Sequence, residues 1–107
     1  MVETVTAEPS ESPWVNLLGW RNWRLRRQLT AECNRELGPG HELHGRIQTA
    51  VARCSACDDV VFRLKRDAGF AVVHLTWSAR GETPPWPRAT VLPTFLALES
   101  VMDHHEH

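Results

Sequence analysis

The stretch that most constrains the fold is residues 70–78, FAVVHLTWS, the most strand-like run in the sequence. β-Branched and aromatic residues favour a pleated sheet, in which alternate side chains point to opposite faces. The two faces of this run, neither of them plainly polar, are Ala71, Val73, Leu75 and Trp77, and Phe70, Val72, His74 and Thr76. We therefore expect a central strand that is covered, at least in part, on both sides.

The composition is typical of one globular domain. The chain has 107 residues, 42% of them hydrophobic and 23% charged, and its formal net charge of −1 gives no overall field that favours nucleic acid or a membrane. No apolar run approaches the roughly 18 residues that span a bilayer, and residues 1–12 lack the pattern of a signal peptide. Three cysteines do not suggest a secreted disulfide scaffold. These features predict a cytoplasmic protein.

A tail, a single domain and a second tail divide the chain. Residues 1–12 are acidic and polar, so we expect them to be disordered. Ser12 as an N-cap and Pro13 at the first helical position predict a helix over residues 13–37. Gly38, in the left-handed conformation, and Pro39 would end this helix. The domain would then cover residues 13–103, followed by a polar, histidine-rich tail at 104–107.

The predicted N-terminal helix has two faces of different character. At 100° per residue its core stripe is Trp14, Leu18, Leu25 and Leu29, flanked by Val15 and Cys33. The second face carries Trp20, Trp23, Arg24 and Arg27. Tryptophan and arginine dominate interface hot spots, so this face is a candidate docking surface. Alternatively, the tryptophans cover the edge of the core and the arginines are solvated.

The rest of the domain is predicted to be mainly strands. Residues 46–53, with Ile47, Thr49 and Val51 on one face, and residues 60–65 are typical of two strands. A hairpin at 66–69, with Gly69 at positive φ, leads into the 70–78 strand. Residues 88–92 are a possible edge strand, and Pro93 opens a short last helix. The sequence thus predicts an α+β fold: an antiparallel three- to four-stranded meander with a long N-terminal helix and a short C-terminal helix packed on it.

Histidine and cysteine pairs suggest a possible zinc site. His41-x-x-His44 and Cys54-x-x-Cys57 supply ligand types that zinc prefers. The strand between the pairs would hold them roughly 30 Å apart, so we do not expect one shared four-ligand site. A site built on Cys54 and Cys57, with His74 or a tail histidine and one further unidentified ligand, stays open beside the alternative of ordinary thiols in a turn. Redox activity is disfavoured, because the motif precedes a strand and not a helix.

His74 is the best candidate for acid–base chemistry. His74 and Thr76 would place an imidazole and a hydroxyl on one strand face, and histidine is the most common general acid or base. If the protein is an enzyme, we expect His74, Thr76 and Asp59 to be its catalytic residues. The alternative is a structural histidine, hydrogen-bonded beneath a helix.

Three segments carry a resemblance to a protein family. They are DDVVF at residues 58–62, FAVVHLTWS at 70–78 and PWP at 85–87, and together they resemble a family of small uncharacterised bacterial proteins. The resemblance covers roughly residues 41–87 and implies a single α+β domain of about this length, but no particular activity. It suggests which positions to mutate first: Asp59, His74, Thr76, Trp77 and Trp86.

The leading functional hypothesis is a small protein-interaction module with an accessory, regulatory or immunity-type role, and not an enzyme. It would bind a partner protein through the helix face described above and through Trp86, which Pro85 and Pro87 hold in an extended loop. The alternatives are a small enzyme or ligand-binding protein with a pocket around His74, and a zinc-stabilised module using Cys54 and Cys57. Nucleic-acid binding is a weaker hypothesis, based on a modest basic patch of Arg21, Arg24, Arg26 and Arg27.

Overall fold

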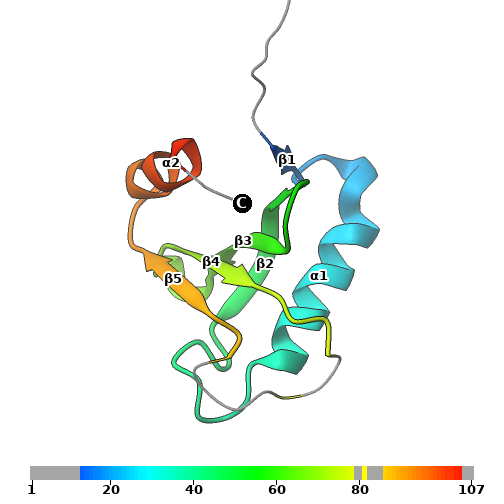
Figure 1. The fold of residues 1–107 in the computed structure, drawn as a ribbon, viewed down its shortest axis with the longest axis vertical. Helices are drawn as coiled ribbons and strands as arrows, with labels where there is room; N and C mark the ends of the chain where they lie inside the picture. Colours follow the sequence, from blue (N-terminus) through cyan, green and yellow to red (C-terminus); the bar gives the residue numbers. More distant parts are fainter. Residues whose placement is uncertain (1–12, 79–80, 82–85, 105–107) are drawn as a thin grey trace, which may run out of the picture.

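The computed structural model describes residues 13–78, 81 and 86–104. The predicted tail at 1–12, residues 105–107 of the predicted tail at 104–107, and most of the loop before Trp86 lie outside the described residues. A five-stranded sheet runs through the domain in the order β1-β2-β3-β4-β5, each strand antiparallel to its neighbours (Figure 1). The strands are β1 (Trp14–Asn16), β2 (Ile47–Cys54), β3 (Asp59–Leu64), β4 (Phe70–His74) and β5 (Ala89–Leu92). The predicted α+β class and antiparallel meander are confirmed, with one strand more than expected.

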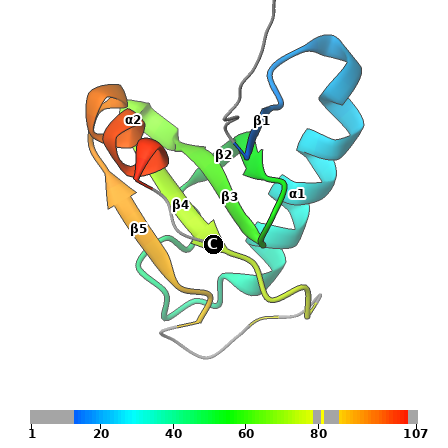
Figure 2. The same cartoon turned by 45° about the horizontal axis from the view of Figure 1, so that its top comes forward.

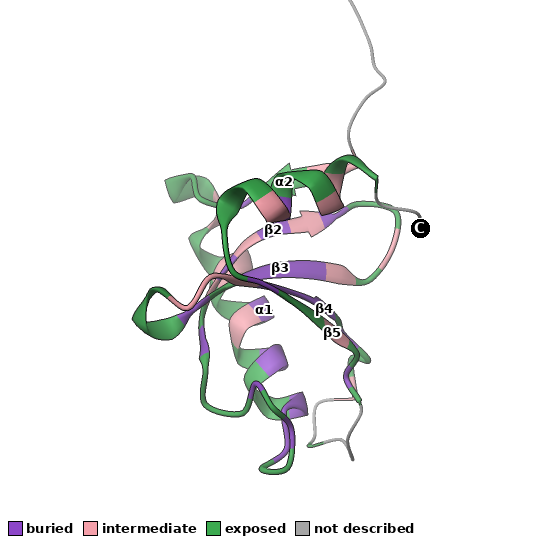
Figure 3. Ribbon diagram, turned by 90° about the vertical axis from the view of Figure 1, so that its left-hand side faces the viewer, coloured by how far each residue is buried: buried purple, intermediate pink, exposed green. Residues whose placement is uncertain are grey.

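Two helices cover opposite faces of the sheet. Helix α1 (Trp23–Glu36) lies on one face and α2 (Phe95–Asp103) lies on the other, which the views along the sheet show directly (Figures 2 and 3). Thr94 caps α2, because its hydroxyl accepts a hydrogen bond from the Ala97 N–H at 3.1 Å. Neither helix of the described residues is long and apolar enough to cross a membrane.

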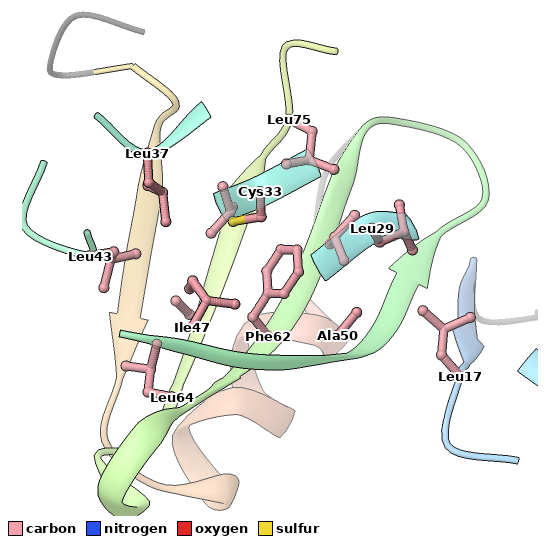
Figure 4. Packing of buried hydrophobic residues seen from close by; sticks show 13 residues of the cluster. Leu17, Leu29, Cys33, Leu37, Leu43, Ile47, Ala50, Phe62, Leu64 and Leu75 are labelled. Carbon is pink, nitrogen blue, oxygen red and sulfur yellow. The ribbon is translucent and has the colours of Figure 1, made fainter. Parts of the chain in front are cut away.

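The hydrophobic core forms two layers, one under each helix. The larger cluster lies between α1 and the sheet, with Phe62 at its centre and side chains from the helix and the sheet around it (Figure 4). The smaller cluster lies under α2 and includes Val61, Val72 and Leu98. Alternation along β3 and β4 sends successive side chains into the two clusters, as expected of strands buried on both faces.

Strand β2 departs from the predicted alternation. Ile47 and Ala50 belong to the α1 cluster, whereas Ala52 belongs to the α2 cluster. The pairing with β3 shifts register between Ile47 and Thr49 and again between Ala50 and Ala52. Each irregularity exchanges the faces of the residues that follow it. The prediction that Ile47, Thr49 and Val51 share one inward face is therefore wrong.

The N-terminal half of the predicted helix is not α-helical. Residues Trp14–Asn16 form β1 at the sheet edge, Trp20–Asn22 form a 3₁₀ turn (η2), and α1 begins only at Trp23. The Pro13 carbonyl accepts a hydrogen bond from Ser55 N–H at 2.8 Å, and the Trp14 indole N–H donates to the Met102 carbonyl at 3.3 Å. These long-range contacts override the local helix-start signal.

The predicted core stripe packs against the sheet only in the part of the segment that is α-helical. Leu25, Leu29 and Cys33 pack against the sheet, but Trp14 and Val15 lie in a strand and Leu18 is 61% exposed. The helix ends near Gly38 as predicted. The left-handed glycines of the described residues are Gly45 and Gly69, so the predicted left-handed cap at Gly38 is wrong.

The 70–78 run is a strand only as far as His74. Leu75 is still buried, but Trp77 has a φ of +61° and its side chain is 50% exposed. The prediction that the strand continues through Trp77, with Trp77 on the same face as Leu75, is therefore wrong. The physical reason lies in Glu36, whose carboxylate binds the backbone of Thr76 and Trp77 and draws it away from the sheet.

Candidate functional site

The outer side of α1 carries a stripe of polar residues that borders an open hollow. Arg24, Arg27 and Arg35 lie at helical spacing, beside the stripe that packs on the sheet. Together with Trp23, Glu32 and Trp77 they line a hollow of about 720 Å³. We call this hollow the tryptophan groove.

Trp23 forms one wall of the tryptophan groove and is stacked with arginines. The guanidinium carbons of Arg24 and Arg27 lie 5.3 and 5.8 Å from the centre of its rings. Cation–π contacts at exposed sites stabilise by about 0.5–1 kcal/mol each, so they restrict an indole that is still 43% exposed. Among the described residues, neither arginine forms an ion pair with a carboxylate, which leaves their positive charge available to a ligand.

Trp77 lines the groove from outside α1, and Glu36 determines its position. The two carboxylate oxygens of Glu36 accept hydrogen bonds from Thr76 N–H at 2.8 Å and from Trp77 N–H at 2.7 Å. The Trp77 indole N–H donates to Asp58 Oδ1 at 3.3 Å. A left-handed conformation costs a bulky residue about 1–2 kcal/mol, and these hydrogen bonds offset that cost.

Two glutamates are buried beneath the groove, one helical turn apart. Glu32 is 3% exposed and Glu36 is fully buried. The pKa of Glu36 is raised to about 7: burial is the largest cause, a hydrogen bond with Glu32 also raises it, and the bonds from Thr76 and Trp77 act in the opposite direction. Arg35 donates to Glu32 Oε1 at 2.8 Å, which places one positive charge beside the pair. The helix thus carries a carboxyl pair that holds a proton close to neutral pH.

The structure separates the predicted partner-binding residues into three groups. Trp23, Arg24 and Arg27 line the tryptophan groove. Trp20 lies in the preceding 3₁₀ turn, strongly exposed, with Arg21 stacked on it at 5.2 Å.

The third group, Trp86, lies just before β5, where the Arg88 guanidinium stacks on it at 4.8 Å. Arg26, part of the basic patch considered for nucleic acid, donates to the carbonyls of Leu17 and Gly19. Its guanidinium therefore supports the chain ahead of α1, and the patch is smaller than the sequence suggests.

A second hollow lies beside β4 and β5 and contains His74. Its volume is about 630 Å³, and its lining includes Glu42, Asp59, His74 and Arg88. His74 Nδ1 and Asp59 Oδ1 are 2.8 Å apart, because the two residues are directly opposite each other in the β3–β4 pairing. Thr76 does not join them: its backbone N–H and its side chain both bind Glu36 on the α1 side. The expectation that His74 and Thr76 share one face is therefore wrong.

The remaining histidines of the zinc hypothesis are engaged with the backbone. His41 Nδ1 accepts a hydrogen bond from Leu43 N–H at 3.0 Å, so Nε2 carries the proton and donates to the Pro87 carbonyl at 2.8 Å. His44 Nδ1 donates to the Leu37 carbonyl at 2.8 Å. Both ring nitrogens of His41 are thus occupied, and neither can bind a metal in this arrangement.

Cys54 and Cys57 lie near the turn after β2. Cys54 is buried and its sulfur accepts a hydrogen bond from Ala56 N–H at 3.4 Å. The pKa of Cys57 is raised to about 11. Burial is the largest cause, and a hydrogen bond with Cys54 also raises it. Across residues 13–78, 81 and 86–104 there is no group of three or more metal-binding side chains. Zinc binding by the two thiols stays a prediction, with no third ligand identified in this part of the chain.

Sequence reasoning missed the two buried glutamates and the role of Trp77. A signal was present, since Glu32 and Glu36 follow Leu29 by three and seven positions and so fall on the predicted core stripe. A carboxyl group on the buried face of a helix needs hydrogen-bond partners, and that need could have marked the site. The partner itself, the backbone at Trp77, is 41 positions away in the chain.

No protein-family model, curated protein or solved structure matches this chain. The resemblance of residues 58–62, 70–78 and 85–87 to a family of small bacterial proteins therefore stays a prediction. Function has to be argued from the geometry of the sites themselves.

Proposed function

We propose that the protein is an interaction module that binds an acidic segment of a partner protein in the tryptophan groove. The observation that carries this proposal is the presence of two half-exposed tryptophans, Trp23 and Trp77, in one hollow with Arg24 and Arg27. Exposed tryptophans beside arginines are typical of interface hot spots. Their positions are fixed by stacking and hydrogen bonds, which lowers the entropy cost of binding.

The chemistry of the groove indicates the kind of partner. Arg24 and Arg27 can each form a bidentate pair of hydrogen bonds with a carboxylate. The indole rings of Trp23 and Trp77 offer apolar surface to an aromatic or aliphatic side chain. A segment with acidic residues around one apolar anchor satisfies both requirements, and a hollow of about 720 Å³ suits a short segment better than a large flat interface.

A peptide titration followed by NMR tests the proposal. The probe is a synthetic peptide with four glutamates around one tryptophan, and the control probe has lysines in place of the glutamates. We expect the acidic peptide to shift the indole resonances of Trp23 and Trp77 and the lysine peptide to leave them unchanged. A single-stranded oligonucleotide that shifts the same resonances more strongly than the acidic peptide would contradict the proposed partner class.

Two double variants locate the binding surface. Trp23→Ala with Arg27→Glu removes one wall of the groove and reverses one charge, so peptide binding should be lost. Trp20→Ala with Arg21→Glu changes the same residue types one turn away and should preserve binding. Binding that survives the first pair of substitutions, in a protein with an unchanged melting temperature, would refute the groove as the site.

A second candidate function, binding of a small anion, is supported by the His74–Asp59 hydrogen bond. In the imidazolium form His74 donates Nδ1–H to Asp59 and has an Nε2–H that can donate to an anion, and Arg88 lines the same hollow of about 630 Å³. Inorganic phosphate and acetate are suitable probes, with binding followed by the His74 ring resonances. His74→Gln should abolish their effect on the neighbouring backbone amides, while His104→Gln, an exposed histidine on α2's C-cap, should not. Equal shifts in both variants would exclude His74 as a ligand-binding residue.

A further inference from the structure

The buried carboxyl pair beneath the tryptophan groove does more than the positioning of Trp77 requires. Glu32 lines the groove and Glu36 holds the backbone of Trp77, so both are linked to the binding surface. Neither is needed to fill the core, because an apolar side chain of similar size would do so without the cost of burying a charge. Their placement points to a function in the groove itself.

We propose that Glu32 and Glu36 share one proton beneath Trp77, and that this proton strengthens the binding of an acidic partner in the tryptophan groove. The inference rests on the proposed function. It makes Glu36 a positioning residue: it acts on the partner through Trp77 and through the charge of the groove.

The geometry explains why the proton is shared. Glu32 and Glu36 lie one helical turn apart on the buried side of α1, so their side chains are neighbours, and both are shielded from water. Two ionised carboxylates so placed in a buried site repel each other, and Arg35 places one positive charge beside Glu32. The protonated pair is therefore the favoured state until the pH rises to about neutral, in line with the raised pKa of Glu36.

Loss of the proton acts on the partner through the charge of the groove. It adds a negative charge under Arg24, Arg27 and Arg35, which weakens the attraction of the groove for carboxylates. The backbone N–H groups of Thr76 and Trp77 still donate to Glu36 in its ionised form, so Trp77 keeps its position. Affinity for an acidic partner should therefore fall as the pH rises through about 7. Because the partner binds the protonated form more tightly, its binding should be accompanied by the uptake of at most one proton by the protein.

Other titratable groups face this region and must be separated from the pair. On α1 these are Cys33, which burial and the two glutamates keep protonated by raising its pKa to about 12, and Arg35. Asp58, in the turn after β2, binds the Trp77 indole, and His44 donates to the Leu37 carbonyl next to Glu36. His74 pairs with Asp59, the neighbour of Asp58. Control variants therefore replace each of the two histidines in turn.

The test combines a measurement without partner and a measurement with the acidic peptide. Without peptide, the Trp77 indole resonance should titrate with a midpoint near pH 7 in the wild type and be flat from pH 5.5 to 8.5 in Glu36→Gln. With peptide, wild-type affinity should fall about tenfold between pH 6 and pH 8, and the affinity of Glu36→Gln should be constant. The glutamates of the peptide stay ionised over this range and do not contribute.

Matched variants assign the transition to the pair. His44→Gln, His74→Gln and Glu99→Gln, an exposed glutamate on α2, should each keep the wild-type midpoint. Should Glu36→Gln fail to fold, Glu32→Gln replaces it: its amide donates to Glu36, favours the ionised form and should move the midpoint well below pH 6.

The outcomes distinguish this inference from the proposed function. A peptide that binds equally at pH 6 and pH 8, or a Trp77 resonance that does not titrate, overturns the shared proton and leaves the groove as a binding site. A midpoint that moves with either histidine also overturns it. If the acidic peptide binds at no pH, the proposed function is refuted. The proposed effect of the shared proton on binding is then refuted as well.

Discussion

Replacement of Glu36 by glutamine should change how the stability of the fold depends on pH. The folded protein holds a proton on Glu36 up to about pH 7, whereas the unfolded chain releases it near 4.5. Because the folded state binds the extra proton between these values, the free energy of unfolding decreases as the pH rises. The stabilising contribution is complete below about 4.5 and is lost as the pH passes through about 7.

The structure sets the size of this effect. At 1.36 kcal/mol per pH unit, a rise from 4.5 to about 7 corresponds to about 3 kcal/mol. Glutamine removes the titration but has only one oxygen for the two N–H groups of Thr76 and Trp77, which costs about 1–3 kcal/mol for the unsatisfied donor. We therefore expect Glu36→Gln to be less stable than the wild type at pH 5 and nearly equal to it at pH 8.5.

Urea denaturation, followed by tryptophan fluorescence at several pH values, measures both curves. Glu99→Gln serves as the control, since this glutamate is exposed and its loss should shift the curve little at every pH. Two parallel curves for the wild type and Glu36→Gln would refute the reasoning, because Glu36 would then bind the same number of protons in the folded and unfolded states.

Three further predictions concern the core, the β3–β4 connection and the thiols. Phe62→Ala should lower the free energy of unfolding by about 3–5 kcal/mol in the same urea assay, because Phe62 is fully buried at the centre of the α1 cluster. Gly69→Ala should cost at least about 2 kcal/mol, since φ is +100° and the new Cβ would lie 2.4 Å from the Leu92 carbonyl oxygen; a neutral effect would contradict this backbone geometry. Cys57 should react with iodoacetamide at pH 8 about 10-fold more slowly than a cysteine in an unfolded peptide, because a pKa raised from 9.0 to about 11 lowers its thiolate fraction more than it increases the reactivity of the thiolate, and peptide mapping by mass spectrometry would show this.

The hairpin of β3 and β4 could be predicted because its information is local. Alternating apolar residues, a glycine at the turn and side chains that fill both faces all lie within residues 59–74, and the structure agrees with each of them. The same holds for the end of α1 and for the short last helix. In these segments local preference and tertiary packing favour the same conformation.

The N-terminal segment was mispredicted because its partners are distant in the sequence. Ser12 and Pro13 form a genuine local start signal, and the apolar spacing after them fits a helix. The segment nevertheless pairs with β2, and the Trp14 indole reaches α2, 88 positions away. Helix propensity differs by only a few tenths of a kcal/mol per residue. Pairing with the edge of the sheet and the hydrogen bond to a distant carbonyl group together stabilise the strand by more than this.

The candidate sites show the same division between local and distant information. The spacing along one helix identified Trp23, Arg24 and Arg27 as a surface, and the structure adds Trp77 from the segment after β4. The strand pattern continues through Trp77 and so places it on one strand face with Leu75. The strand ends earlier, since a carboxylate from α1 binds the backbone N–H groups there.

The buried glutamates provide the strongest physical reason to regard this region as functional. Burying two carboxyl groups on the core side of a helix destabilises a fold relative to apolar residues, even when hydrogen bonds satisfy them. Here those hydrogen bonds hold a tryptophan in a strained backbone conformation at the surface and leave its side chain half exposed. A structural role alone would not require an exposed indole, and a well-packed helix would not require the carboxyl pair. Both features are expected together when the pair supports a binding surface, because departures from the most stable arrangement concentrate where a protein functions.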